Sequence, residues 1–184
     1  MDDKRIIELF FSRDELAIAS AAAKYGGYLS KIAGSILNND EDTEECVNDT
    51  YLKAWNAIPP KEPDPLKTFL GKITRNLALD LYDKKTADKR GGTQVEICLD
   101  ELSELIPDSG IDNMEQGEIT EIINRFLESI SKDDRKLFVR RYWYMDPIKK
   151  LSHDFLISES NVKTKLFRMR SELKKRFEEE GIEI

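Results

Sequence analysis

The residues with the most distinctive chemistry form a basic run late in the sequence, NVKTKLFRMRSELKKRF (residues 161–177). This run holds seven Lys or Arg residues and one acid, although the 184-residue chain carries 29 Lys and Arg against 36 Asp and Glu, a formal net charge of −7. Lysine and arginine bind phosphates, and arginine also pairs with guanine in the major groove of DNA. A basic run inside an acidic chain therefore predicts a local nucleic-acid site.

Helical spacing divides this run into two faces. One face is an apolar stripe that we expect to be buried, made of Val162, Leu166, Met169, Leu173 and Phe177. The opposite face carries Lys163, Thr164, Phe167 and Arg168, with Lys165 beside them, and there a phenylalanine can touch a thymine methyl group. A solvated basic helix whose phenylalanine packs on a neighbouring helix fits the same spacing, so that alternative stays open at this point.

The residues before the run complete a helix-turn-helix pattern. DPIKKLSHDF (146–155) predicts a short helix that Pro147 starts, and LIS (156–158) leads to the basic helix, which Ser158 or Ser160 can cap. This arrangement places its second helix in the major groove. Two further amphipathic helices are expected in 119–130 and 133–145, so residues 119–184 are predicted to form one helical domain.

The first half, residues 1–90, is also predicted to be helical. Two helices are expected within residues 5–37, divided by the glycine pair Gly26-Gly27. A third should run from Asp42, which can form a capping box with Glu45, to the prolines that follow Ile58. Its predicted buried stripe is Val47, Tyr51, Ala54, Trp55 and Ile58.

A fourth helix is expected over PLKTFLGKITRNLALDLYDKK (65–85), with the buried stripe Phe69, Ile73, Leu77 and Leu81. The following segment, residues 91–118, opens with two glycines and holds many acids without any Lys or Arg. We predict an acidic flexible linker there, with one short helical turn around LDELSEL (99–105). The expected fold is therefore all-α, with two small helical domains joined by this linker.

Composition and spacing argue against several other classes. No apolar run approaches the roughly 18 residues of a membrane span, and the opening MDDKRIIELF does not resemble a signal peptide, so we expect a cytoplasmic protein. Cys46 and Cys98 lie far apart and indicate neither a disulfide nor a zinc site. His153 is the single histidine, and no metal-ligand spacing or phosphate-binding loop accompanies it. We therefore expect no metal, no cofactor and no enzymatic activity.

The motifs of both halves together resemble the extracytoplasmic-function (ECF) sigma factors of bacterial RNA polymerase. DTEECVNDTYLKAWNAI (42–58) resembles their region 2 helix through its acidic cluster, Tyr51 and the pair Ala54-Trp55. FLGKITRNLALDLYDKK (69–85) is similar to the promoter-melting helix that follows, and NVKTKLFRMRSEL to the recognition helix of region 4. The order of these matches, with an acidic segment between them, is that of the family.

The resemblance implies a protein that binds the polymerase core and directs it to particular promoters. Region 2, residues 1–90, is expected to bind the clamp helices of the largest polymerase subunit through Glu45, Asn48, Asp49 and Leu52. It is also expected to melt the downstream promoter element and hold it through Lys72, Arg75, Asn76 and Lys84, with Asn76 bonding an extruded base. Region 4, residues 119–184, is expected to read the upstream element as duplex through Lys163, Thr164, Lys165, Phe167 and Arg168. An anti-sigma protein is a further expected partner.

This chain also departs from the family pattern. Phe69 stands where the family usually has tryptophan, Asp83 where it has arginine, and Ser152 where it has alanine. Asp83 removes a positive charge beside the expected DNA path, so its effect on downstream-element recognition stays open. The acidic linker could thread through the polymerase or act as a plain tether.

Two other classes remain compatible with the residues. A helix-turn-helix repressor would dimerise on a palindromic duplex without polymerase, and a helical adaptor would bind an acidic protein through its basic end.

Overall fold

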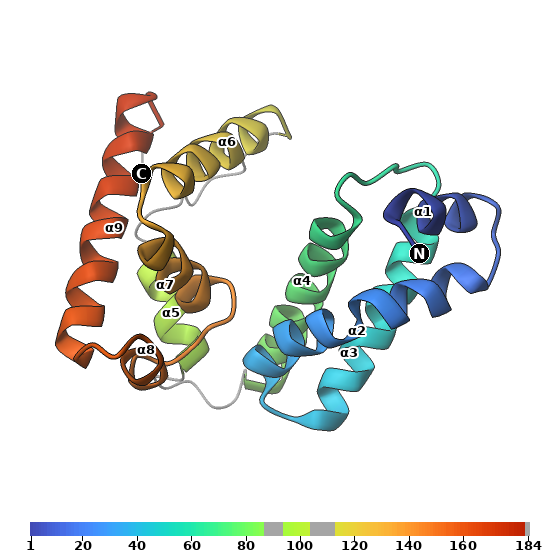
Figure 1. Ribbon diagram of the computed structural model, residues 1–184, viewed down its shortest axis with the longest axis horizontal. Coiled ribbons are helices and arrows are strands. Elements are labelled where there is room, and N and C mark those ends of the chain that lie inside the picture. The colour runs from blue at the N-terminus through green and yellow to red at the C-terminus, as the bar shows by residue number, and fades with distance from the viewer. Residues whose placement is uncertain (87–93, 104–112, 183–184) are drawn as a thin grey trace. The chain divides into compact units, whose positions relative to one another are not determined.

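A computed structural model of the chain describes residues 1–86, 94–103 and 113–182, and these residues form helices and loops with no strand among them (Figure 1). The predicted all-α fold class is confirmed. The chain divides into two compact units, Met1–Arg90 and Gly91–Ile184, which are described separately below as the first and the second unit. Across the described ranges, no helix is both long and apolar enough to span a lipid bilayer.

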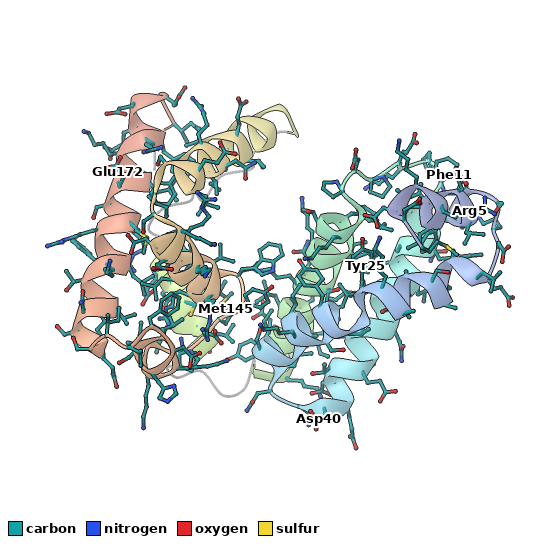
Figure 2. All side chains as sticks on the ribbon, in the orientation of Figure 1. Arg5, Phe11, Tyr25, Asp40, Met145 and Glu172 are labelled. Atoms are coloured by element: carbon teal, nitrogen blue, oxygen red, sulfur yellow. The ribbon has the colours of Figure 1, made fainter. Side chains whose placement is uncertain are left out.

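The helices of the first unit are α1 (Asp3–Phe11), α2 (Leu16–Leu37), α3 (Asp40–Ala57) and α4 (Leu66–Thr86). α2, α3 and α4 pack against one another, and α1 packs against α2. Their contacts bury apolar side chains such as Leu29 and Ile32 of α2 and Leu70 of α4. Tyr25 of α2 also lies inside this unit (Figure 2), where its hydroxyl donates a hydrogen bond to Asp3 of α1.

α2 continues through Gly26-Gly27, where the sequence predicted a break. An interior glycine costs a helix about 1 kcal/mol relative to alanine, so the pair weakens α2 without ending it. Burial of the apolar face of α2 against α3 and α4 offsets this cost. The chain instead turns between Phe11 and Leu16, where Arg13 has a φ of 57° and its guanidinium lies 5.3 Å from the ring centroid of Trp55 on α3.

α3 begins earlier than predicted. Asn39, and not Asp42, is its N-cap, and the side chain of Asn39 accepts a hydrogen bond of 2.9 Å from the backbone N–H of Asp42. The run NNDED offers several good capping residues in a row, and local preference does not choose among them. Asp42 instead pairs with Lys85 of α4, a contact invisible to local reasoning. The predicted end of the helix before Pro59 is confirmed.

The buried stripe of α4 is also different from the predicted one. The fully buried residues are Leu66, Leu70, Thr74 and Ala78, whereas the predicted stripe of Phe69, Ile73, Leu77 and Leu81 is only half-buried. The buried side of α4 also carries Gly71, and its small residues, Gly71, Thr74 and Ala78, let α2 and α3 approach closely. A methyl group on Gly71 would lie 2.5 Å from the Tyr28 hydroxyl of α2, so this approach depends on glycine.

The helices of the second unit are α5 (Gln94–Ser103), α6 (Asn113–Ser129), α7 (Lys132–Tyr142), α8 (Ile148–Phe155) and α9 (Glu159–Glu179). One apolar core joins them, with Phe126 of α6, Phe138 of α7, Leu151 of α8 and Leu166 of α9 among its buried members. Met145, in the loop between α7 and α8, is also buried here (Figure 2).

Part of the predicted linker belongs to this unit. Residues 94–103 form a full helix, α5, that packs against α7, and α6 begins at Asn113, where the sequence predicted a helix only from residue 119. The expectation of a flexible linker with a single helical turn is therefore wrong for residues 94–103. The remaining parts of the 91–118 segment, at 91–93 and 104–112, lie outside the described residues.

Candidate nucleic-acid interfaces

α8, a short turn and α9 form the predicted helix-turn-helix. Ser158 is the N-cap of α9, and its hydroxyl oxygen accepts a hydrogen bond of 3.2 Å from the backbone N–H of Asn161. Leu156 ends α8 in the left-handed conformation, with φ 55° and ψ 39°. The hydroxyl of Ser152 donates to the Ile157 carbonyl at 2.6 Å, so the residue that departs from the family's alanine closes the turn between the two helices.

Three ion pairs hold α8 against α7. Asp146, whose side chain is 7% exposed, accepts from Arg140 Nε at 2.6 Å and from Lys150 Nζ at 2.7 Å. Arg140 also donates from Nη2 to Asp154 at 2.6 Å. Arg140 of α7 thus contacts both the loop before α8 and the last turn of α8, and these contacts add to the apolar packing that holds α8 on the core. His153 is exposed, and its Nδ1 lies 3.0 Å from Asp154 Oδ1.

The two predicted faces of α9 are confirmed. Its apolar stripe is buried, with every member at 7% exposure or less: Val162, Leu166, Met169, Leu173 and Phe177. On the other side Phe167 is 62% exposed, so it does not pack into a neighbouring helix. Lys163, Thr164 and Arg168 are also exposed beside it. This side presents cationic, hydroxyl and aromatic groups, a combination that suits phosphates and base edges.

Lys165 differs from the other predicted contact residues of α9. Its Nζ lies 2.8 Å from Asp134 Oδ1 of α7, and Asp134 also accepts a hydrogen bond from the hydroxyl of Ser131, the N-cap of α7. The hydrogen bond from Lys165 is the main cause that lowers the pKa of Asp134 below its usual value, against the opposing effect of burial. Lys165 therefore neutralises an acid within the fold. The sequence gives no local sign of this pair, which joins residues 31 positions apart.

The predicted contact residues of α3 occupy one exposed face. Glu45, Asn48, Asp49 and Leu52 all point away from the core, and Leu52 is 57% exposed. The stripe predicted for the opposite face is buried at Val47, Tyr51, Ala54 and Ile58 and half-buried at Trp55. An exposed leucine surrounded by acids and an amide is a feature of protein interfaces, where an apolar anchor is rimmed by polar groups.

The predicted contact residues of α4 lie along most of its length. Lys72 and Asn76 are one turn apart and exposed, Arg75 is half-buried, and Lys84 is exposed near the end of the helix. Asp83 is exposed next to Lys84. The structure thus presents an amide and a lysine together at the middle of α4, with Arg75 next to Asn76 and Lys84 about two turns further along the helix.

A buried polar contact that the sequence analysis missed joins α3 to α4 directly before Arg75 and Asn76. Thr50 Oγ1 lies 3.0 Å from Thr74 Oγ1, and both residues are fully buried. Each hydroxyl also lies 2.9 Å from a carbonyl one turn earlier on its own helix, Cys46 for Thr50 and Leu70 for Thr74. Neither threonine belongs to the buried stripe that the sequence predicted for its helix, so no local pattern marked this contact. It depends on the packing of one helix against the other.

Comparison with known proteins adds independent information. The sigma-70 region 2 family model matches residues 22–87. The ECF RNA polymerase sigma factor SigM of Bacillus subtilis is 25% identical over 153 residues, which cover 82% of this chain and 90% of that protein. The RNA polymerase sigma factor CnrH of Cupriavidus metallidurans is 32% identical over 72 residues, 39% of this chain and 38% of that protein. A solved structure of CnrH in complex with the cytosolic domain of CnrY aligns over 96% of this chain and 97% of that one, with 19% identity and a TM-score of 0.44.

Proposed function

The chain belongs to the ECF sigma factors, which act in transcription initiation, and we propose that its two units divide that work. The first unit, as region 2 over residues 1–90, binds the polymerase core and melts the downstream promoter element. The second unit reads the upstream element as duplex through a region 4 domain over residues 119–184. The promoter DNA and the polymerase core are the partners of this function, and no cofactor takes part in it.

The exposed face of α3 carries this proposal. It lies within the residues that match the sigma-70 region 2 model, and it combines two acids, an amide and a solvent-exposed leucine on one side of a well-packed helix. We propose that Glu45, Asn48, Asp49 and Leu52 contact the clamp helices of the largest polymerase subunit. The acids favour a basic partner and its rapid association, and Leu52 supplies apolar area at the centre of the contact.

The DNA contacts follow from the exposed residues of α4 and α9. On α4, Asn76 can both donate to and accept from an extruded base, while Lys72, Arg75 and Lys84 neutralise the backbone of the melted strand. On α9, Lys163, Thr164, Phe167 and Arg168 face the duplex. Lys165 joins them only if it leaves Asp134, so we assign it a weaker role.

The test of the polymerase contact is co-elution of the purified chain with bacterial RNA polymerase core on a sizing column. Asp49→Arg should abolish co-elution, because it places a cation against the basic partner. The matched control is a charge reversal on α3 outside the assigned face. Asp40→Arg makes the same charge change at an exposed residue at the start of α3, on the opposite side of the helix from Asp49, and it should leave co-elution intact.

The possible results separate the candidate functions. Loss with Asp49→Arg but not with Asp40→Arg supports the assigned face, whereas equal loss with both variants refutes it. A folded wild-type chain that does not bind the core at all would refute the sigma function. A palindromic duplex bound without polymerase would then favour a repressor, and indifference to DNA would favour an adaptor.

We further propose that a protein partner of the anti-sigma class holds the chain inactive in the cytoplasm until a signal releases it. The family membership supports this partner. Purification of the tagged chain from unstressed cells should yield it together with a second protein that is not a polymerase subunit. Repeated recovery of polymerase subunits alone would contradict the expectation.

A further inference from the structure

α5 packs against the rest of the second unit through an apolar face, and its other sides carry acidic residues. Val95 and Cys98 are buried at 4% and 0% exposure, and Leu102 packs against the apolar core of the unit. These positions follow one another by three and four residues, which places them on one side of the helix. The charged residues of α5 are Glu96, Asp100 and Glu101, all acidic. An acidic amphipathic helix therefore lies on the unit that carries the basic helix α9.

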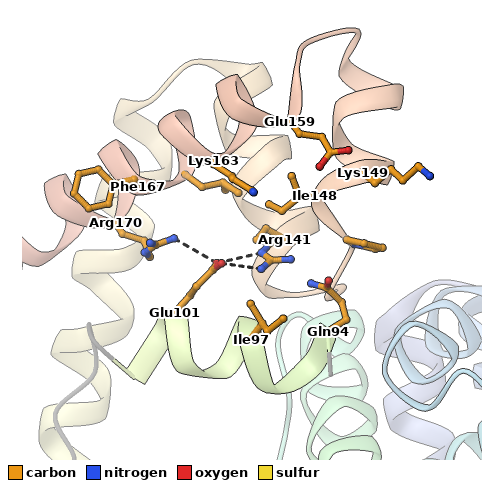
Figure 3. Close-up of a pocket in the computed structure, with 12 residues that line it drawn as sticks. Gln94, Ile97, Glu101, Arg141, Ile148, Lys149, Glu159, Lys163, Phe167 and Arg170 are labelled. Atoms are coloured by element: carbon orange, nitrogen blue, oxygen red, sulfur yellow. Dashed lines mark hydrogen bonds and ion pairs between the residues drawn. The ribbon is translucent and has the colours of Figure 1, made fainter. Parts of the chain in front are cut away.

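Glu101 ties α5 to this unit through a bidentate ion pair (Figure 3). Its carboxylate accepts from Arg141 Nη2 at 2.8 Å and from Arg141 Nε at 3.1 Å, and the Arg141 side chain is 1% exposed. Burial is the largest single effect and lowers the pKa of Arg141, but the hydrogen bonds to Glu101 and the charge interactions with Glu101, Cys98 and Tyr142 together raise the pKa above its usual value. The guanidinium therefore stays charged and depends on its partner.

The same carboxylate also engages α9. Arg170 Nη1 lies 3.3 Å from Glu101 Oε2 and donates at 2.7 Å to the Tyr142 hydroxyl, which itself donates to Glu101 at 2.9 Å. One acid of α5 thus neutralises two arginines, one of them on the basic helix. Bidentate and charge-assisted bonds of this kind are among the strongest polar contacts in proteins.

The space between α5 and α9 includes part of the proposed DNA-reading face. A cavity of about 620 Å³ is lined by Ile97 and Glu101 on the side of α5 and by Lys163, Phe167 and Arg170 on the side of α9. Figure 3 shows Lys163 and Phe167 across this cavity from α5. α5 therefore borders one edge of the surface that carries two of the four assigned duplex contacts.

We infer that α5 is a displaceable acidic cover of the DNA-reading face: while Glu101 holds Arg141 and Arg170, α5 weakens binding of duplex DNA, and bound DNA displaces it. This inference rests on the proposed role of α9 in reading duplex DNA. Two physical effects support it. A recognition helix in the major groove has phosphate backbones along both its edges, and the acids of α5 repel the backbone on their side within the screening distance of about 8–10 Å. Phosphate oxygens also offer Arg170 an anionic partner in place of Glu101, and they offer the exposed Lys163 a partner as well.

Amide hydrogen exchange of the wild-type, full-length chain tests directly whether α5 is displaced. It is measured with and without a random-sequence duplex of about 30 base pairs, at low salt, where non-specific binding is strong. Amides of residues 94–103 should be protected in the free chain and should lose that protection when DNA is bound. Unchanged or increased protection in the complex would overturn the inference, since α5 would then be a fixed support of the domain. An α5 that is unprotected in the free chain would overturn it as well.

A pair of variants measures the strength of the cover. Glu101→Gln keeps the shape of the side chain and removes the charge, and it should raise duplex affinity by about fivefold or more, the lower end of ordinary coupling between sites. Asp100→Asn removes the same charge one residue earlier, at an exposed position, and should raise affinity clearly less than Glu101→Gln does, because it weakens the repulsion without releasing the arginines that Glu101 holds. Circular dichroism checks that both variants fold, and the exchange experiment does not depend on either of them.

The results separate the cover from the proposed function. Equal affinities of wild type and Glu101→Gln, with clear DNA binding by both, would refute the cover and leave the reading of DNA intact. Weaker binding by Glu101→Gln would show that α5 supports the interface. Failure of the wild type and of both variants to bind any duplex would refute the role of α9, and the cover with it.

Discussion

Lys163 and Lys165 are two lysines of one helix for which the structure predicts unequal contributions to DNA binding. Lys163 is exposed, whereas Lys165 Nζ is held 2.8 Å from Asp134. To reach a phosphate Lys165 must release this partner, and a partly exposed pair of this kind is worth up to about 1 kcal/mol. Lys163→Ala should therefore weaken duplex binding more than Lys165→Ala does.

The salt dependence of binding gives this difference a magnitude. Each phosphate contact adds about 0.9 to the slope of log K against log salt, so one lost contact reduces the fall in affinity between about 50 and 200 mM salt by about 3.5-fold. Lys163→Ala should make the negative slope shallower by about 0.9, and Lys165→Ala should make it shallower by clearly less. Asp134→Asn frees Lys165 and should make the negative slope steeper by up to about 0.9.

Fluorescence anisotropy of a labelled random-sequence duplex, titrated with the full-length chain at several salt concentrations, measures these slopes. The four proteins compared are the wild type, Lys163→Ala, Lys165→Ala and Asp134→Asn. Equal slopes for the two lysine variants, together with no change in Asp134→Asn, would refute the reasoning. That result would mean that Asp134 does not restrain Lys165 in solution.

Three further predictions concern the stability and reactivity of the chain. Leu156 is 90% exposed and has a φ of 55°, so Leu156→Gly relieves a left-handed strain of about 1–2 kcal/mol, although the greater freedom of glycine in the unfolded chain cancels part of this gain. In urea denaturation the free energy of unfolding should rise by up to about 1 kcal/mol for Leu156→Gly and should not rise for Leu156→Ala. Phe126→Ala removes a fully buried ring and should cost about 3–5 kcal/mol in the same assay, whereas Phe167→Ala, at a position 62% exposed, should cost less than about 0.5 kcal/mol while weakening duplex binding. Burial, with Asp49 and Glu45 nearby, raises the pKa of Cys46 to about 11, so the thiol stays protonated at pH 8; in a Cys98→Ser background it should react with iodoacetamide only after unfolding, and rapid reaction of the folded chain would contradict its burial.

Much of α9 could be predicted from the sequence alone. Its buried stripe and its exposed Phe167 follow from the spacing of apolar residues three and four positions apart. Every α-helix places residues at this spacing on one side, whatever packs against it. The exposed face of α3 followed in the same way from Glu45 to Leu52. The Pro59-Pro60 pair also marks the end of α3 locally, because proline cannot donate the helical hydrogen bond.

Other features depend on partners far away in the sequence. α4 carries two candidate stripes, and its contacts with α2 and α3, such as the close approach of Tyr28 to Gly71, decide which stripe is buried. α2 passes through its glycine pair because packing on α3 and α4 outweighs the local preference. These choices are made by contacts between helices, which a local pattern does not contain.

Charge is the clearest case of this division. The sequence determines that the chain places cations on α9 and acids around residues 94–118, and the period of the helix determines which cations share a face. The tertiary structure decides which of those cations are free to bind a ligand: Lys165 pairs with Asp134, Arg170 pairs with Glu101, and Lys163 stays exposed. An ion pair requires two atoms within about 4 Å, and that distance is set by the packing of helices from separate parts of the chain.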